Sequence, residues 1–166
     1  MKKKIVSLFM AATLSASISL CSCGKEVPFG KEEVVERKLS TVNYQVPKEW
    51  AEETSNDVNV HFPGGTADPN ASYIMTAFID DQPFDEYIDG IAENGAENFE
   101  KEEVTIDGTK GYKVTFTMQD ETGDASCIMY SVSTDDGIFT AAYSQSSNGE
   151  DYSDYIDKLV HTVKFK

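Results

Sequence analysis

Residues 111–144 read GYKVTFTMQDETGDASCIMYSVSTDDGIFTAAYS, and the expected fold class follows from this stretch. Apolar and polar side chains alternate from Gly111 to Met118, and a strand-like pattern returns in residues 126–132 and 138–144. Such alternation is typical of strands with one buried face. Turn-forming residues separate the three runs, at 120–123 and 135–137. Strands joined by short turns pair as hairpins, so the stretch predicts an antiparallel sheet.

Two segments with helical periodicity accompany these strands. Residues 83–98 place apolar side chains at the spacing of one helix face, namely Phe84, Tyr87, Ile88 and Ile91. A second set near the end of the chain follows Asp151, which we expect to be its N-cap: Tyr152, Tyr155, Ile156, Leu159 and Val160. An apolar helix stripe needs a surface to cover, so both helices should pack on the sheet.

Three further strands are predicted before the first helix. Residues 42–46 and 58–62 alternate, whereas residues 73–79 (YIMTAFI) are apolar almost throughout, as in a strand covered on both faces. The element order is strands, helix, antiparallel strands and helix. The sequence therefore predicts an α+β protein, an antiparallel sheet with helices on both sides.

The segment Tyr44-Gln45-Val46-Pro47-Lys48-Glu49-Trp50 resembles the start of PsbP-like domains, where an aromatic strand runs into Pro-x-x-Trp. The closing pattern is similar too, with the helix at 155–160 followed directly by His161-Thr162-Val163-Lys164-Phe165. The resemblance covers residues 39–166 and implies an α/β/α sandwich around an antiparallel sheet. It supplies no catalytic or metal-binding residues.

The N-terminus predicts export and lipid anchoring. Three lysines precede an apolar run from Ile5 to Leu20, which is typical of a secretory signal peptide over residues 1–22. Leu20 and Ser22 precede Cys23 as in the bacterial lipobox, so Cys23 is the predicted site of diacylglycerol attachment. The alternative is ordinary signal cleavage, which would leave a soluble secreted protein. Residues 23–38, charged and containing glycine and proline, are predicted to be the lipidated cysteine and a tether; the alternative is that Val34, Val35 and Leu39 begin a short element.

Processing at Cys23 leaves Cys127 as the one remaining thiol, which we expect to be a small apolar strand residue rather than a reactive group. Loss of the signal peptide also lowers the net charge from −15 to −18, because that segment contains three lysines and no acids. A strongly acidic protein lacks the basic surface that nucleic acid requires. The expected location is extracytoplasmic, with the membrane contacted through the lipid.

Catalytic and metal-binding patterns are not found in the sequence. His61 and His161 are the two candidate imidazole bases, and both are predicted to be solvated. No Gly-x-Ser-x-Gly elbow and no cysteine or histidine pair with zinc spacing occurs. We therefore expect no catalytic residue, no metal and no cofactor.

Two features remain as candidate contact sites. Asp85, Asp89, Glu93 and Glu97 follow one another at intervals of four, which predicts an acidic helix stripe that either binds cations or is merely solvated. Trp50 is either a ligand-stacking platform or a core residue. The resulting expectation is a non-enzymatic, lipid-anchored binding or accessory protein. A cation-binding or envelope-structural protein and a small hydrolase are the alternatives.

Overall fold

The computed structural model describes residues 28–68, 70–80, 82–120, 123–147 and 149–166. The predicted signal peptide, with Leu20, Ser22 and Cys23, lies outside the described residues. Within them, no helix is long and apolar enough to cross a membrane. The elements are β1 (Val34–Leu39), β2 (Val42–Pro47), β3 (Ala51–Ser55), β4 (Val58–Phe62), β5 (Tyr73–Ile79), α1 (Phe84–Glu93), β6 (Glu97–Ile106), β7 (Thr109–Asp120), β8 (Gly123–Thr134), β9 (Gly137–Gln145), α2 (Ser153–Thr162) and β10 (Lys164–Phe165).

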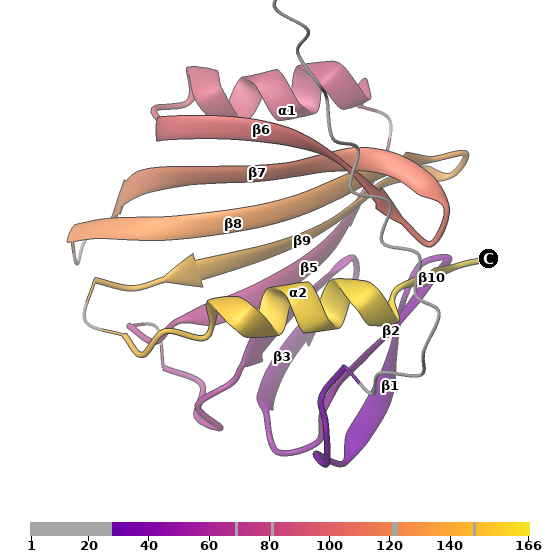
Figure 1. Ribbon diagram of the computed structural model, residues 1–166, viewed down its shortest axis with the longest axis vertical. Coiled ribbons are helices and arrows are strands. Elements are labelled where there is room, and N and C mark those ends of the chain that lie inside the picture. Colours follow the sequence, from indigo (N-terminus) through magenta and orange to yellow (C-terminus); the bar gives the residue numbers. More distant parts are fainter. Residues whose placement is uncertain (1–27, 69, 81, 121–122, 148) are drawn as a thin grey trace, which may run out of the picture.

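The strands form two antiparallel sheets (Figure 1). The larger has the order β3-β4-β5-β9-β8-β7-β6, and the smaller has the order β1-β2-β10. Strand β5 lies inside the larger sheet, third from one edge, whereas β6, which follows it after α1, is at the other edge. The connection must therefore pass over β9, β8 and β7, and α1 lies on the face that it crosses.

The predicted hairpins are confirmed. Strands β6 to β9 pair in sequence, with Ile106 opposite Thr109 and Thr134 opposite Gly137 across two-residue turns. The first of these turns is Asp107-Gly108, and both of its residues have positive φ, as a type I′ turn requires.

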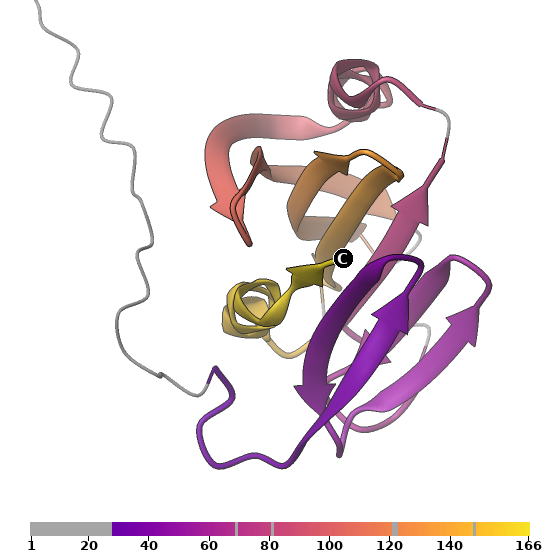
Figure 2. The ribbon, with the colours of Figure 1, turned by 90° about the vertical axis from the view of Figure 1, so that its right-hand side faces the viewer.

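Alternation along β7, β8 and β9 gives the sheet two buried faces. One face packs against α2 and the smaller sheet, in a core that includes Val132, Phe139 and Ile156. The other packs against α1 through Val114, Met129 and Ile88. Figure 2 shows the two helices on opposite sides of these strands, as the sequence predicts. We call the α1 side the outer face.

The two edge strands of the larger sheet differ from the prediction. Residues 51–55 (AEETS) form β3 without any apolar alternation, and β6 begins at Glu97 rather than near Val104. Both strands are charged and largely exposed, which protects a sheet edge from pairing with other chains but removes the periodicity that sequence analysis detects.

The predicted tether is too long, because the globular domain begins well before residue 39. Strand β1 starts at Val34, and Phe29 is already buried. The Phe29 ring stacks on Tyr155 of α2 and meets Trp50 edge-on, with centroid distances of 6.2 and 5.9 Å. Phe29 lies in a charged segment without regular apolar spacing, so only its partners on α2 and beside β2 reveal that it belongs to the core.

Trp50 is a core residue and not an exposed platform. It is 9% exposed and also packs edge-on against Tyr155 at 5.1 Å. Its position after Pro47 places it where the N-terminal segment, the smaller sheet and α2 meet.

We expect Trp50→Ala to lower the free energy of unfolding by about 3–5 kcal/mol, because it removes a large buried side chain and leaves a cavity. Urea denaturation followed by far-UV circular dichroism measures the change without depending on tryptophan fluorescence. Lys48→Ala, at an exposed neighbouring position, is the control and should change stability by less than about 0.5 kcal/mol. A cost below about 1 kcal/mol for Trp50→Ala would contradict the core assignment.

Candidate functional site

A difference in length between helix and strands leaves part of the outer face uncovered. Helix α1 has 10 residues, whereas β7 and β8 have 12 each. At about 1.5 Å per helical residue and about 3.4 Å per strand residue, the helix spans roughly 15 Å and the strands roughly 40 Å. The helix ends where Asn94 caps it and Gly95 takes a positive φ of 92°. Beyond that point the sheet continues without a covering helix.

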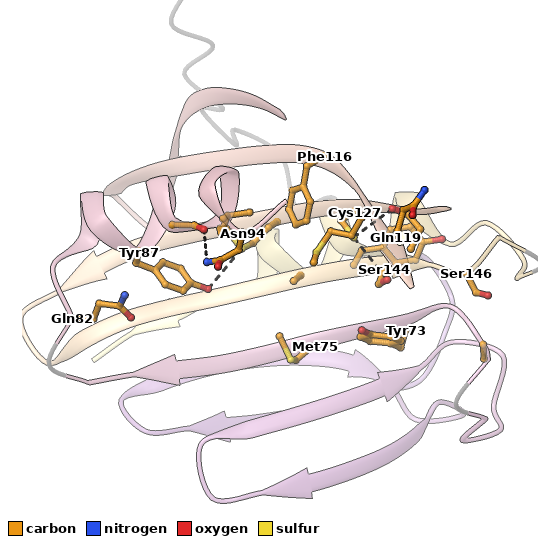
Figure 3. Close-up of a pocket in the computed structure, with 18 residues that line it drawn as sticks. Tyr73, Met75, Gln82, Tyr87, Asn94, Phe116, Gln119, Cys127, Ser144 and Ser146 are labelled. Carbon is orange, nitrogen blue, oxygen red and sulfur yellow. Dashed lines mark hydrogen bonds between the residues drawn. The ribbon is translucent and has the colours of Figure 1, made fainter. Parts of the chain in front are cut away.

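The uncovered region is an open groove of about 590 Å³ (Figure 3). Small-molecule sites typically have volumes between about 300 and 1,000 Å³. Residues of α1, of the sheet and of its connecting loops line it: Ala71, Tyr73, Met75, Gln82, Tyr87, Gly90, Ile91, Asn94, Phe116, Met118, Gln119, Ala125, Cys127, Met129, Ala142, Tyr143, Ser144 and Ser146.

Strand register gives the groove a floor and two walls. Ala142 of β9 lies between Met75 of β5 and Met129 of β8. Two residues further along β9, Ser144 lies between Tyr73 and Cys127. Small side chains therefore run along β9, with larger ones on either side. In Figure 3, Tyr73 and Met75 lie on one side of the groove, and Phe116 and Cys127 lie on the other.

Within the described part of the chain, the lining contains no charged side chain, although the chain carries a net charge of −15. It is also rich in sulfur, because every methionine and cysteine after residue 27 is part of it: Met75, Met118, Met129 and Cys127. Methionine side chains are flexible and polarizable, so surfaces built from them adapt to apolar ligands of varied shape. Cys127, predicted to be a small apolar strand residue, is half-buried in this lining.

The two ends of the groove differ. Beneath α1, the Tyr87 hydroxyl donates a hydrogen bond to Met129 Sδ at 3.7 Å, and burial raises the pKa of Tyr87. At the other end Met118 is 40% exposed, and Gln119 donates from Nε2 to Asp124 Oδ1 at 3.3 Å. The end beneath α1 thus carries the Tyr87 hydroxyl and the Gln82 amide, and the end at Met118 is the more exposed to water.

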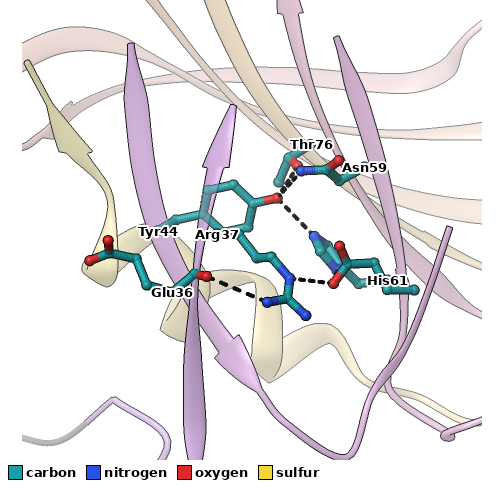
Figure 4. Close-up of polar contacts among 7 residues, drawn as sticks. Glu36, Arg37, Tyr44, Asn59, His61 and Thr76 are labelled. Carbon is teal, nitrogen blue, oxygen red and sulfur yellow. Dashed lines mark hydrogen bonds and ion pairs between the residues drawn. The ribbon is translucent and has the colours of Figure 1, made fainter. Parts of the chain in front are cut away.

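A second polar site lies between the two sheets, and it corrects the prediction for His61. The imidazole is fully buried rather than solvated, and Nε2 is 3.0 Å from the Tyr44 hydroxyl (Figure 4). The same hydroxyl accepts a hydrogen bond from Asn59 and bonds Thr76, each at 2.8 Å. Residue 61 has the alternation expected for an outward position, but the smaller sheet covers that face.

The Glu52 carboxylate approaches His61 without a hydrogen bond. Glu52 Oε2 lies 3.7 Å from Nδ1 and is paired with Arg37, and no described residue forms a hydrogen bond with Nδ1. Burial lowers the pKa of His61 from 6.5 to about 4, which outweighs the opposing effect of Glu52. A general base needs a hydrogen-bond path to substrate. The His61 imidazole is fully buried and its Nε2 faces the Tyr44 hydroxyl, so it has no such path to substrate.

The predicted acidic stripe is not continuous. Asp85, Asp89 and Glu93 belong to α1, but the helix ends at Glu93 and Glu97 begins the edge strand β6. Asp89 faces Lys101 of β6, with 3.4 Å between Oδ1 and Nζ. Among the described residues, no group of three or more His, Cys, Asp or Glu is placed to hold a metal ion.

His161 is exposed near the end of α2, as predicted, but the prediction that Asp151 is the N-cap of this helix is wrong by one residue. His161 is exposed, its Nδ1 is 2.6 Å from the carbonyl of Asp157, and it borders a smaller cavity of about 310 Å³. Tyr152 occupies the N-cap position, while Asp151 Oδ1 accepts a hydrogen bond from the Ser153 amide at 2.9 Å. The loop after β4 contributes Ala71 to the groove, and the loop after β9 contributes Ser146.

Comparison with known proteins gives the fold. No protein-family model and no curated protein matches this sequence. The solution structure of cyanobacterial PsbP (CyanoP) from Synechocystis sp. PCC 6803 matches with a TM-score of 0.56, 11% identity and coverage of 89% of this chain and 99% of that one. A crystal structure from Bacteroides thetaiotaomicron matches with a TM-score of 0.52 and 11% identity over 81% of this chain, which spans about half (48%) of that protein. The chain therefore has a PsbP-like α+β fold, and at this identity the likeness concerns the fold alone.

The burial of His61 predicts an acid-dependent loss of stability. The unfolded imidazole takes up a proton below pH 6.5, whereas the folded one does so only near pH 4. The contribution of His61 to the free energy of unfolding is therefore fully present above pH 6.5. It is lost as the pH drops toward 4, and the loss is on the order of 3 kcal/mol. Urea unfolding across this pH range should show a shallower slope for His61→Gln than for wild type.

His161→Gln is the matched control, because His161 is exposed, and it should keep the wild-type slope. NMR titration of the His61 imidazole in the wild type gives the pKa directly, even if His61→Gln folds poorly. Parallel pH curves for wild type and His61→Gln would show that the imidazole is not held neutral by burial.

Proposed function

We propose that this chain is a non-enzymatic, lipid-anchored, extracytoplasmic binding protein, and that the groove beside α1 is its binding site for an apolar small molecule. The groove is the observation that carries the proposal, because it is an uncharged, adaptable apolar surface in a strongly acidic protein. Exposed apolar surface of this kind is costly in water and marks a binding site. The sequence before Gly24 supports the anchoring, through the lysines, the apolar run and the lipobox at Leu20, Ser22 and Cys23.

The two alternatives receive no such support. The cation-binding alternative rested on the acidic stripe, which the end of α1 interrupts. The hydrolase alternative needed a histidine within hydrogen-bond distance of both a carboxylate and a hydroxyl in a cleft. His61 has the hydroxyl, but its carboxylate lies 3.7 Å away and the imidazole is buried.

Gly90 offers a direct test of the groove, because it lies on α1 where the helix faces the cavity. A Cβ built at this position meets no atom within 4 Å. A larger side chain can therefore enter the groove without disturbing the core, and replacing a helical glycine favours the helix.

We expect Gly90→Leu to weaken binding of Nile red, a neutral apolar dye, by at least tenfold. The measurement is dye fluorescence with the chain from Gly24 to Lys166, since both core clusters lie within residues 29–165, and cooperative unfolding of this chain is checked first. Ala92→Leu adds the same side chain at an exposed position outside the groove and should bind like wild type. Equal affinity of the two leucine variants would remove the groove as the binding site.

Anchoring is tested in cells. Cys23→Ala should release the full-length protein from the membrane or leave it unprocessed, because the thioether can no longer form. Cys127→Ala, which removes the other thiol of the mature chain, should remain lipidated and membrane-bound. Fractionation and intact-mass analysis distinguish these outcomes, and a wild-type mass without lipid would refute the anchor.

A further inference from the structure

The shape and charge of the groove narrow the class of ligand, and this step rests on the proposed function. We infer that the groove binds a single-chain amphiphile with an uncharged, hydroxyl-bearing head group. The chain lies along β9 beneath α1, and the head group lies at the open end beside Gln119 and Ser144.

The floor and walls determine the shape of the apolar part. Ala142 and Ser144 lie in line along one strand, and residues on β5 and β8 form walls on both sides. On β8 the lining extends from Met129 to Ala125, about 14 Å at the rise of an antiparallel strand. A long channel with a narrow floor fits one extended chain better than a broad planar ring system.

The ends determine which way the chain points. Beneath α1 the Tyr87 hydroxyl already donates to Met129 Sδ, so this covered side, with the Gln82 amide at its margin, suits the end of a hydrocarbon chain. The opposite end is open and contains the Gln119 amide and the Ser144 hydroxyl. A head group there can remain in water and still exchange hydrogen bonds with both side chains.

Charge then decides the class of head group. Among the residues that the structure describes, none in the lining supplies a positive charge that could pair with a carboxylate or phosphate. The chain as a whole carries a net charge of −15, which repels an anion but not a neutral, hydroxyl-bearing head group. The groove should therefore distinguish neutral from anionic amphiphiles that have the same chain.

The test compares monolauroylglycerol with laurate, two ligands that share a chain of equal length and differ in head-group charge. Calorimetry below their micellar concentrations, with the chain from Gly24 to Lys166, should give at least tenfold weaker binding for laurate at low salt. The difference should shrink as salt is added, because exposed charges are screened. Gly90→Leu should weaken binding of monolauroylglycerol, whereas Ala92→Leu should not.

Equal affinities for the two ligands would overturn the inference and leave the proposed function intact. Binding of Nile red without binding of either amphiphile would overturn it as well. If the wild-type chain bound neither Nile red nor monolauroylglycerol nor laurate, the proposed function itself would be rejected.

Discussion

A strand advances more than twice as far per residue as a helix, and the site depends on this difference. The connection from β5 to β6 must pass over β9, β8 and β7, and it contains α1, a helix of 10 residues that runs along the strands. This helix is too short to cover strands of 12 residues, so apolar side chains that would otherwise be core remain accessible beyond its end. The groove is thus a consequence of topology and helix length, and it needs no specialised loop.

The two faces of the larger sheet have different roles. On the inner face, α2, the smaller sheet and the N-terminal Phe29 bury a continuous core that includes Trp50 and the polar cluster around Tyr44. On the outer face, a small cluster around Ile88 fixes α1 and leaves the rest of the surface open. Most of the buried core therefore lies on the inner face of the larger sheet, and the outer face keeps exposed apolar surface that can bind a ligand. A binding surface can be altered there, as at Gly90, without removing core contacts.

Several predictions were wrong because the environment of a residue is set by segments distant in sequence. Period-two alternation detects strands whose environment differs between their faces, and it identified β2, β4, β7, β8 and β9. Edge strands lack that difference, so β3 was missed and β6 was placed too late. His61 alternates as an outward residue, but a second sheet covers the position. Phe29 was assigned to a tether because its partners, Trp50 and Tyr155, are distant in sequence.

Local patterns in the chain were sufficient for the α+β class, the antiparallel hairpins, the two helices on opposite faces and the resemblance to PsbP-like domains. Each depends on side chains a few residues apart, or on turn residues whose backbone preferences are local. The groove could not be derived in this way. Its lining comes from β5, α1, β7, β8 and β9, and strand register brings these side chains together. The groove also exists because α1 does not extend over these side chains. That is a relation between segments distant in sequence, and no local pattern encodes it.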